Sequence, residues 1–256
     1  MTELGGSARA LYDATSSGWV RTAPVTVSDF TGRPPTLALC QPVEGRRVLD
    51  LGCGEGYCAR ELRRMGAAEV LGVDISVAMI AGARAAEERE PQGIVYEVGD
   101  ATSLPSIPDG RFDLVMGMFV LNYLTIEQTK TALAEVFRVL SPGGRAVMAV
   151  PHPALPFVRD PAPPFWFDAG DAGYFSARDQ RLPGKIERRD GTSLSVQMCH
   201  KTFGDYFDAL REAGFSSMPT VRELCVTREI LTIDPPFFGP LLDTPLHMAF
   251  VAHRES

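Results

Sequence analysis

The segment from Asp50 to Gly56 has the residue types and spacing best suited to binding a ligand. Gly52, Gly54 and Gly56 alternate with other residues, and glycines let a backbone approach a ligand closely. Asp50 lies two positions before the first glycine, and Glu55 lies among them. A loop between a strand and a helix also offers the free N–H groups of the helix start. The pattern therefore predicts a ligand-binding loop rather than a plain strand–helix turn.

Two classes of ligand use such a loop. A dinucleotide places its pyrophosphate at the helix N-terminus, whereas S-adenosylmethionine (SAM) places its methionine part there. The carboxylates of Asp50 and Glu55 would repel a pyrophosphate by ~1–4 kcal/mol for each close pair, but they attract the ammonium and the sulfonium of SAM. The spacing is also GxGxG, not GxGxxG. We therefore expect SAM, with a nicotinamide dinucleotide and an oxidoreductase as the alternative.

Acidic residues also end the next two apolar runs of the chain. Asp74, followed by Ile75, suits the two hydroxyls of a ribose, or else it caps the next helix. Met79 is expected to lie along the adenine or to pack in the core. Asp100 is placed to accept the adenine amino hydrogens beside the N–H of Ala101, or else it is a turn residue. These positions predict a nucleoside subsite next to the glycine loop.

Short apolar runs alternate with amphipathic stretches from about residue 46 to residue 150, and this pattern predicts the scaffold. The apolar runs predict strands at 47–51, 70–73, 94–98, 112–120 and 145–150. The amphipathic stretches predict helices at 57–65, 76–90 and 125–140, with Ser76 as an N-cap and Pro142-Gly143-Gly144 as a stop. Two further runs, 221–226 and 246–252, predict final strands. The alternation is typical of an α/β fold with a Rossmann-like, doubly wound and mostly parallel sheet.

The composition changes after residue 150, because residues 151–184 are rich in proline and in aromatic residues such as Trp166. A long loop inside a compact domain is usually functional or disordered, and disordered segments are poor in aromatics. We therefore predict a substrate lid inserted after the fifth strand. The alternative is that its aromatic residues form a contact between subunits.

Two later signals predict regular structure beyond this loop. The dipeptide Asp190-Gly191 between two alternating segments predicts a hairpin. Thr202, with Asp205 three residues on, predicts the start of a helix that ends at Gly214.

The composition limits the organisation and the partners. A chain of 256 residues suits one domain. We divide it into an N-terminal helical cap (1–44), a SAM-binding core (45–150), a lid (151–203) and a C-terminal helix with strands (204–256). The net charge of −7 argues against nucleic acid as the main partner. Five cysteines without a CxxC pair indicate neither a metal site nor a disulfide framework. With no signal-peptide pattern or membrane-spanning run, we expect a cytoplasmic protein without a membrane partner.

Five segments, taken in order, resemble the class I SAM-dependent methyltransferases: VLDLGCGEG, VLGVDIS, GDATSLP, FDLVMGMFVLNYL and VFRVLSPGGRAVM. The resemblance covers roughly residues 45–150. It implies a seven-stranded sheet whose last strand is antiparallel. It also implies cofactor contacts to the methionine part from Asp50, Gly52 and Gly54, to the ribose from Asp74, to the adenine from Asp100, and a further contact from Phe119.

A narrower resemblance comes from VLNYLTIEQTKTAL, the PHP after the fifth strand and HKTFGDYFDALREAGF, which look like the UbiE/toxoflavin-synthase-like group. Enzymes of that group methylate small molecules, often in bacterial secondary metabolism. Tyr12 resembles the N-terminal tyrosine that closes over SAM in such enzymes, or else it packs in the core of an amphipathic helix.

Methyl transfer to a hydroxyl or a protonated amine benefits from a general base. His152 lies just past the fifth strand, at the sheet edge where ligands of open α/β folds bind, and His200 follows the predicted hairpin. We predict both as catalytic residues on the acceptor side. His247 and His253 fall in or after the last strand, and we interpret them as structural.

The acceptor is expected to be a small molecule methylated at oxygen or nitrogen. No Asp-Pro-Pro-Tyr or Asn-Pro-Pro-Tyr sequence, typical of many enzymes that methylate amino groups of nucleic acids or protein glutamine, follows the fourth strand. On the lid, Asp168 and Tyr174 are further candidate site residues. A homodimer is compatible with this prediction, and a non-catalytic SAM-binding protein is the remaining alternative.

Overall fold

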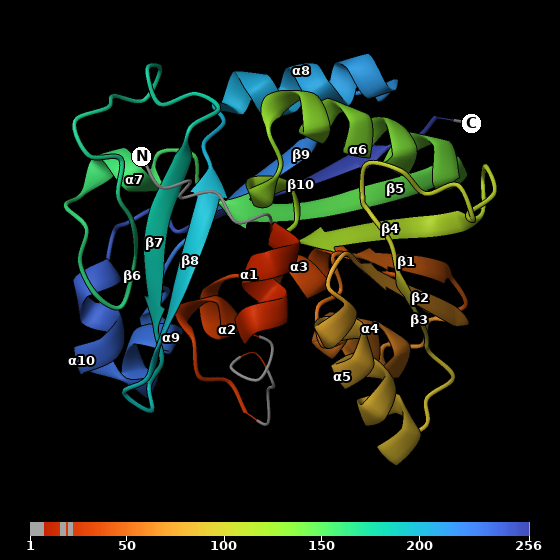
Figure 1. The fold of residues 1–256 in the computed structure, drawn as a ribbon, viewed down its shortest axis with the longest axis horizontal. Coiled ribbons are helices and arrows are strands. Elements are labelled where there is room, and N and C mark those ends of the chain that lie inside the picture. Colours follow the sequence, from red (N-terminus) through yellow and green to blue (C-terminus); the bar gives the residue numbers. More distant parts are fainter. Residues whose placement is uncertain (1–7, 16–18, 20–22, 256) are drawn as a thin grey trace.

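The computed structural model describes residues 8–15, 19 and 23–255. Its centre is a seven-stranded sheet of order β3-β2-β1-β4-β5-β10-β9 (Figure 1). The strands are β1 (Arg47–Leu51), β2 (Glu69–Asp74), β3 (Val95–Val98), β4 (Phe112–Met118), β5 (Leu140–Pro151), β9 (Thr220–Leu224) and β10 (His247–His253). β10 is antiparallel to both of its neighbours, whereas the pairs among β1–β5 are parallel. The predicted Rossmann-like α/β fold is therefore confirmed.

The strand order reverses between β1 and β4. The chain builds β2 and β3 on one side of β1, then returns to place β4 and β5 on the other side. The two crossovers diverge at this point, which leaves a crevice outside the carboxyl ends of β1 and β4. A ligand site is expected there.

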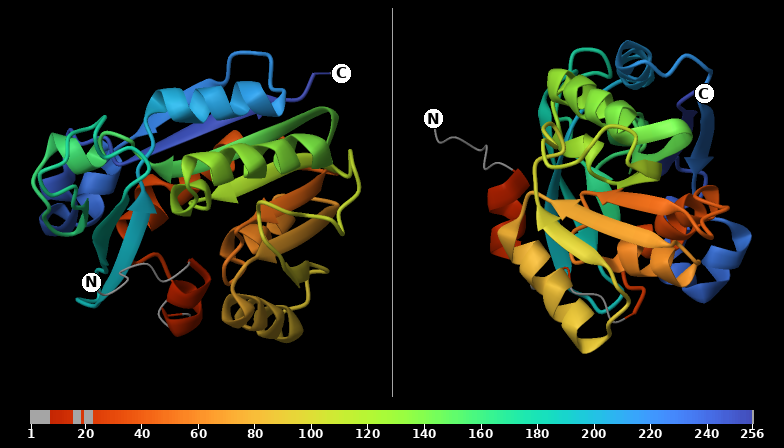
Figure 2. Two further views of the ribbon diagram at one scale, coloured as in Figure 1. Left: turned by 45° about the horizontal axis from the view of Figure 1, so that its top comes forward. Right: turned by 90° about the vertical axis from the view of Figure 1, so that its right-hand side faces the viewer.

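Helices cover both faces of the sheet (Figure 2). One face carries α6 (Ile126–Val139) and α8 (Phe203–Ala213), and the other carries α3 (Arg33–Leu39), α4 (Tyr57–Arg64) and α5 (Val77–Arg89). Successive side chains of a strand point to opposite faces. Thus Val48 packs in one core, while Leu49 packs in the other.

The helix starts follow the predicted capping signals. The Ser76 side chain accepts a hydrogen bond from the Met79 N–H at 3.1 Å and begins α5. Thr202 and Asp205 form a capping box that begins α8, and Gly214 ends that helix with a φ of 112°. Because Ser76 is the N-cap of α5, the alternative that Asp74 caps this helix is wrong.

Three segments differ from the prediction. β4 ends at Met118 rather than at 120, because Phe119 adopts a left-handed φ of 59°. β5 begins at Leu140 rather than at 145. Its register with β4 shifts between Phe112 and Leu114, so the predicted helix stop, Pro142-Gly143-Gly144, lies in an irregular part of the strand. Residues 151–184 are not one loop, since they contain α7 (Leu155–Val158) and β6 (Phe165–Phe167).

The inserted residues form a second, three-stranded antiparallel sheet of order β6-β7-β8. β7 (Arg181–Glu187) and β8 (Ser193–Cys199) are joined by the predicted hairpin, in which Gly191 has a φ of 83°. Figure 1 shows this small sheet beside α1 (Ala8–Thr15), near the carboxyl ends of β4 and β5. The insertion therefore lies where the crevice opens.

The N-terminal segment is tied to both sheets. Thr26, just before α2 (Val27–Thr31), bridges to Arg188 after β7. Residues 1–7, 16–18 and 20–22 of the predicted cap lie outside the described residues, and the boundaries of the four predicted parts stay predictions. The C-terminal part also contains two short helices that the sequence did not predict, α9 (Arg228–Ile233) and α10 (Pro235–Phe238).

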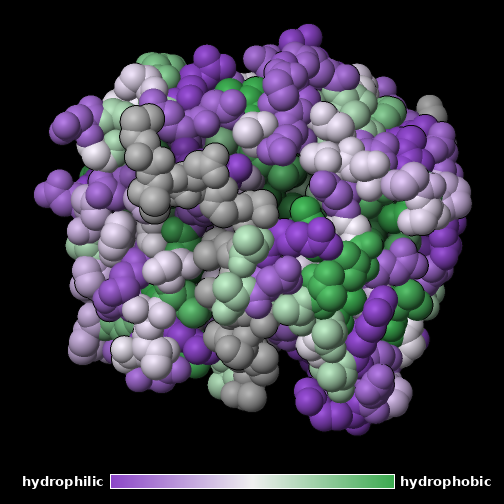
Figure 3. Space-filling view, in the orientation of Figure 1, coloured by the Kyte–Doolittle hydropathy of each residue, from purple (hydrophilic) through white to green (hydrophobic). Residues whose placement is uncertain are grey.

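The surface of the face drawn in Figure 1 is mostly hydrophilic, with hydrophobic residues in smaller patches (Figure 3). Within the described part of the chain, no helix has the length and apolar character that crossing a membrane requires.

Candidate functional site

A cavity lies at the carboxyl edge of the large sheet, between the glycine loop, the N-terminal helices and the small sheet. All ten residues predicted to hold the cofactor line it: Tyr12, Asp50, Gly52, Gly54, Asp74, Ile75, Met79, Asp100, Ala101 and Phe119. The predicted catalytic residues His152 and His200 do not line it.

The glycine loop turns with its backbone exposed to this cavity. Gly52, Gly54 and Gly56 have φ values of 72°, 55° and 83°, a left-handed conformation that favours glycine. A Cβ on Gly52 would lie 2.7 Å from the side chain of Val120, but a Cβ on Gly54 would meet no atom of the described residues within 4 Å. The open space at Gly54 is therefore part of the cavity, where a ligand can approach the backbone.

Asp50 is the least compensated charged group of the cavity. Its residue is 1% exposed, and neither carboxylate oxygen has a hydrogen-bond partner among the described residues. Burial, and secondly the charge of Asp74, raise the pKa of Asp50 to about 8. A buried acceptor of this kind requires a donor, and the ammonium of SAM meets that requirement.

Asp74 and Glu55 both line the cavity, but their partners differ. Arg60 forms an ion pair with Glu55 at 2.6 Å, so the charge of Glu55 is compensated within the protein. Asp74 accepts hydrogen bonds from the backbone N–H of Gly54 and of Ser76, each at 2.9 Å. The sequence argument for SAM therefore rests more on Asp50 and Asp74 than on Glu55, whose charge Arg60 compensates.

The nucleoside positions combine structural and cavity-lining roles. Asp100 Oδ1 accepts hydrogen bonds from the N–H and the hydroxyl of Thr102, both at 2.8 Å. Oδ1 of Asp100 therefore has the turn role that was the alternative. The residue is also exposed and lines the cavity, so it has a place beside the cofactor as well. Met79 is 2% exposed and packs with Trp19 and the small sheet, so it is both a core and a cavity residue.

Tyr12 holds α1 over the cavity. Its hydroxyl donates to the hydroxyl of Tyr123 at 2.5 Å, and its ring centroid lies 5.5 Å from that of Trp19. All three aromatic residues line the cavity. The packing alternative for Tyr12 is therefore compatible with a place beside the cofactor.

The side of the cavity away from the glycine loop is largely apolar. Its wall consists of Phe165, Phe167, Ile186 and Val196 from the small sheet. Arg33 also lines the cavity; the sequence analysis missed this residue, which pairs with Asp29 at 2.9 Å. The sequence did offer a signal for this ion pair, because Asp29 and Arg33 are four positions apart, the spacing at which oppositely charged side chains meet on a helix.

The predicted catalytic histidines are engaged elsewhere. His152 Nδ1 accepts from the Ala154 N–H at 3.1 Å, and its Nε2 lies 2.7 Å from Glu223. His200 Nε2 lies 2.8 Å from the carbonyl of Tyr174. His152 follows Pro151, which does line the cavity, and alternation along an extended chain turns adjacent side chains to opposite sides. Their predicted role on the acceptor side therefore lacks geometric support, as it does for Asp168 and Tyr174, whereas His247 lines the cavity.

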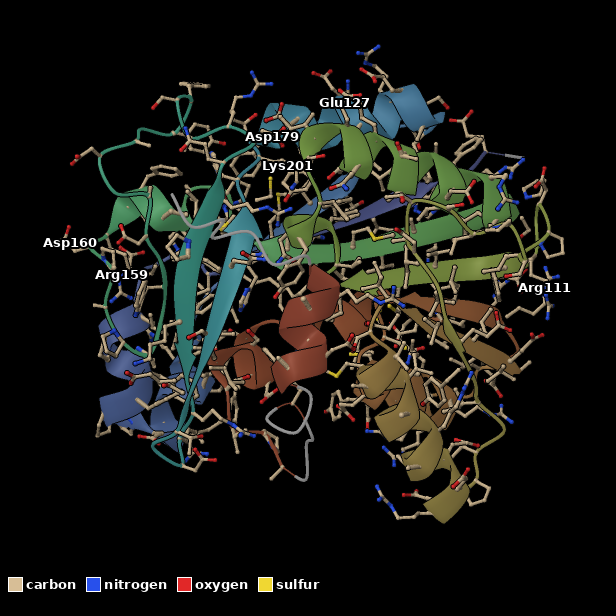
Figure 4. All side chains as sticks on the ribbon, in the orientation of Figure 1. Arg111, Glu127, Arg159, Asp160, Asp179 and Lys201 are labelled. Atoms are coloured by element: carbon tan, nitrogen blue, oxygen red, sulfur yellow. The ribbon has the colours of Figure 1, made fainter. Side chains whose placement is uncertain are left out.

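The small sheet is fixed to the loop that follows β4. Figure 4 shows Asp179 and Lys201 near the N-terminal end of α6. The buried Lys201 ammonium donates to the carbonyls of Leu124 and Cys199, and burial lowers the pKa of Lys201 to about 8. Asp179 accepts from the Ile126 N–H at 2.7 Å. The insertion is therefore anchored beside Leu124, which itself lines the cavity.

A family model described as a methyltransferase domain matches residues 48–144. A SAM-dependent methyltransferase from Mesorhizobium loti is 30% identical, and its crystal structure matches with a TM-score of 0.64 over 86% of this chain and 96% of its own. The chain therefore belongs to the SAM-dependent methyltransferases. The predicted cofactor, SAM, is confirmed by this membership.

Two curated relatives match over shorter lengths. The demethylmenaquinone methyltransferase of Clavibacter sepedonicus is 34% identical over 62% of this chain, and the ribosomal protein L11 methyltransferase of Burkholderia vietnamiensis is 35% identical over 46%. The chain spans 64% and 38% of the length of these relatives. Their names give acceptors as different as a quinone precursor and a protein.

Proposed function

We propose that this protein transfers the methyl group of SAM to a small molecule, at an oxygen or a nitrogen atom. The observation that carries the proposal is the buried, unpartnered carboxylate of Asp50 beside the open backbone of Gly54, in a cavity whose far side is apolar. One half of the cavity suits a charged cofactor, and the other suits an uncharged molecule. The narrower resemblance to small-molecule enzymes supports a role in bacterial secondary metabolism.

The residues of the glycine loop and the following strands hold the cofactor in this proposal. Asp50 accepts hydrogen bonds from the ammonium, the backbone at Gly52 and Gly54 faces the methionine part, and Asp74 faces the ribose. The nucleoside contacts come from Ile75, Met79, Asp100 and Ala101, with Tyr12 above and Phe119 towards the acceptor. SAM, when bound, supplies a methyl group already activated on a sulfonium.

The remaining residues enclose the acceptor and exclude water from it, which favours transfer from a positioned donor. Phe165 and Phe167 of the small sheet, with Tyr12 of α1, close the cavity over the sheet edge. An acceptor must fit beneath these elements, which favours a small molecule over a protein or a nucleic acid. Planar aromatic side chains also pack well on a planar acceptor.

The proposal is tested by calorimetry with S-adenosylhomocysteine and with NAD. We expect binding of S-adenosylhomocysteine alone, because the carboxylates of Asp50 and Asp74 repel a pyrophosphate. Binding of NAD without S-adenosylhomocysteine would favour the oxidoreductase alternative. Turnover of methyl-labelled SAM with a panel of small acceptors separates an enzyme from a non-catalytic SAM-binding protein.

A pair of glycine substitutions tests the position of the cofactor. Gly54→Ala places a methyl group in the open space of the cavity, so we expect at least a tenfold loss of affinity, about 1.4 kcal/mol. Gly45 is the matched control, because it has a similar φ of 71°, has no atom within 4 Å of its Cβ position and does not line the cavity. Both substitutions should lower the free energy of unfolding by about 1–2 kcal/mol. Equal affinity for the two variants would refute the proposed position.

A further inference from the structure

His247 is a buried histidine at the acceptor end of the cavity. It is the first residue of β10, lies opposite Pro151 of β5, and is 0% exposed while lining the cavity. β10 pairs with β5, β5 with β4, and β4 with β1, so β10 lies three strand spacings from the strand that carries Asp50. At ~4.8 Å for each spacing, this separation is roughly 14 Å. His247 therefore lies away from the cofactor loop.

The hydrogen bonds around His247 define which ring nitrogen carries the proton. The Thr31 hydroxyl lies 2.9 Å from the carbonyl of Val27, which can only accept, and 3.1 Å from His247 Nε2. A hydroxyl has one proton to donate. The arrangement that satisfies both contacts has Thr31 donating to Val27 and Nε2–H donating to Thr31. The lone pair of the imidazole is then on Nδ1.

Nδ1 has no hydrogen-bond partner among the described residues, and it is buried. It lies across the ring from Thr31 and from Gly32, whose Cβ position is 3.1 Å from His247 Cδ2. Burial first, then the charges of Arg33 and His152, lower the pKa of His247 to about 3. The ring is therefore neutral at ordinary pH and presents an acceptor without a donor.

We propose that His247 Nδ1 accepts a hydrogen bond from a neutral hydroxyl of the methyl acceptor, a phenol or an enol, and takes up its proton during transfer. This inference rests on the proposed function. Two aromatic rings lie beside the imidazole, with the centroids of Phe119 and Phe165 at 5.1 and 5.3 Å. They suit an acceptor whose hydroxyl is attached to a planar, apolar framework.

A neutral hydroxyl fits this position better than a protonated amine. The acceptor atom must donate a hydrogen to Nδ1 and still offer a lone pair to the methyl carbon, which a protonated amine lacks. An ammonium acceptor would also add a cation while the sulfonium is still present, near the guanidinium of Arg33, whose carbon is 5.5 Å from the centre of the Phe119 ring; the imidazolium forms only as the sulfonium charge is lost. Taking an unpaired ammonium into an apolar wall is costly.

The proposed step balances in atoms and charge. The hydroxyl oxygen forms a bond to the methyl carbon, the carbon–sulfur bond breaks with its electron pair going to sulfur, and the hydroxyl proton moves to Nδ1. The positive charge of the sulfonium is lost as the imidazolium forms. The total charge of the cavity therefore stays constant. The imidazole of His247 is a weak base, but it takes up the proton as the neighbouring sulfonium loses its positive charge.

The test measures binding to the protein saturated with S-adenosylhomocysteine, using 4-nitrophenol and, as a matched probe without the hydroxyl donor, 4-nitroanisole. We compare the wild type with His247→Leu and His247→Asn. Both variants lose the contact with Thr31, but only asparagine keeps a hydrogen-bond acceptor near the position of Nδ1. His200→Gln is the control, since it changes a buried histidine that lies outside the cavity. The nitrogen spectrum of histidine-labelled protein gives a readout independent of activity.

We expect the wild type to prefer 4-nitrophenol about tenfold, the scale of one hydrogen bond to a buried acceptor. His247→Leu should abolish the preference, while His247→Asn and His200→Gln should keep most of it. The Nδ1 resonance should be that of an unprotonated nitrogen and should shift when the phenol binds. No preference in the wild type, an unchanged preference in His247→Leu, or a protonated Nδ1 overturns the inference. Loss of S-adenosylhomocysteine binding by the wild type would instead overturn the proposed function.

Discussion

The two halves of the cavity are built in different ways. Most of the cofactor half comes from residues 50–119, in which Asp50, Asp74 and Asp100 lie at or just after the ends of parallel strands, with Tyr12 added from α1. The acceptor half combines Arg33 from the N-terminal helices, Phe165 from the insertion and His247 from the last strand. The first half is local in sequence, and the second exists only in the folded chain.

The difference also extends to the chemistry of each half. The cofactor half concentrates buried carboxylates, whereas the acceptor half places a compensated Arg33–Asp29 pair and a neutral His247 in an apolar surround. A buried carboxylate without a charged partner favours a cation, and a buried acceptor without a partner favours a hydrogen-bond donor. The same cavity thus separates a charged ligand from an uncharged one by the state of its own residues.

The largest effect that tests this contrast is expected from Asp50→Asn. The substitution removes the charge that pairs with the cofactor ammonium, so affinity for S-adenosylhomocysteine should fall by about 10–100-fold, the scale of a hydrogen bond to a charged group. Above pH 8, where the ligand-free protein carries the buried carboxylate, the variant should melt at a higher temperature than the wild type. Calorimetry and thermal unfolding measure the two changes.

Glu55→Gln is the control for that experiment. Glu55 pairs with Arg60, so its replacement should lower protein stability but change the affinity by less than about threefold. If the two substitutions reduced affinity equally, the cofactor half would depend on its overall negative charge rather than on Asp50.

The pH dependence of cofactor binding gives the next largest effect. The raised pKa of Asp50, about 8, means that the carboxyl is protonated in the ligand-free protein at lower pH. Binding of an ammonium favours the carboxylate, so affinity for S-adenosylhomocysteine should rise from pH 6 to pH 8 by up to about tenfold per unit. Calorimetry across this range should show proton release, and Asp50→Asn should remove the dependence.

The same group has the opposite effect on the stability of the ligand-free protein. Its folded pKa lies above the unfolded value, so the native state holds the extra proton between about pH 4 and pH 8. The contribution of Asp50 to stability should therefore fall as pH rises through this window. A rise over the same range, compared with Asp50→Asn, would contradict the raised pKa.

The fold was predictable to the extent that it depends on local patterns. Apolar runs and capping residues such as Ser76 and Thr202 gave the strands and helices of the core, because periodicity and caps act within a few residues. The small sheet was only partly predicted. β6 is only three residues long and directly follows Pro163 and Pro164, and it exists because it pairs with β7, a contact between distant residues.

The candidate site shows the same limit. The cofactor positions were found because strand ends and glycines mark them in the sequence. The choice among the histidines was wrong in geometry, since His152 lies at the expected edge but turns away, and His247 reaches the cavity through antiparallel pairing of the last strand with β5. Whether a side chain at a strand end reaches the cavity depends on the order and direction of the strands. The residues next to it in the sequence do not determine either property.

The smallest predicted effect concerns Phe119, the residue between the two halves. Its φ of 59° is strained for any residue except glycine, and it packs against His247 while lining the cavity. Phe119→Gly and Phe119→Ala both remove the ring, but only glycine relieves the backbone. We therefore expect the glycine variant to be more stable by about 1 kcal/mol, measured by urea unfolding.

Phe137 provides the matched control for this comparison, because it lies within α6 and also packs a ring against neighbours. There the order should reverse, with alanine more stable than glycine by about 1 kcal/mol, as in any helix interior. The same order at both positions would mean that Phe119 carries no backbone strain. If the glycine variant is the more stable only at position 119, then the backbone of Phe119 is strained. This strain lies where the cofactor half meets the acceptor half, and it holds an aromatic ring against His247.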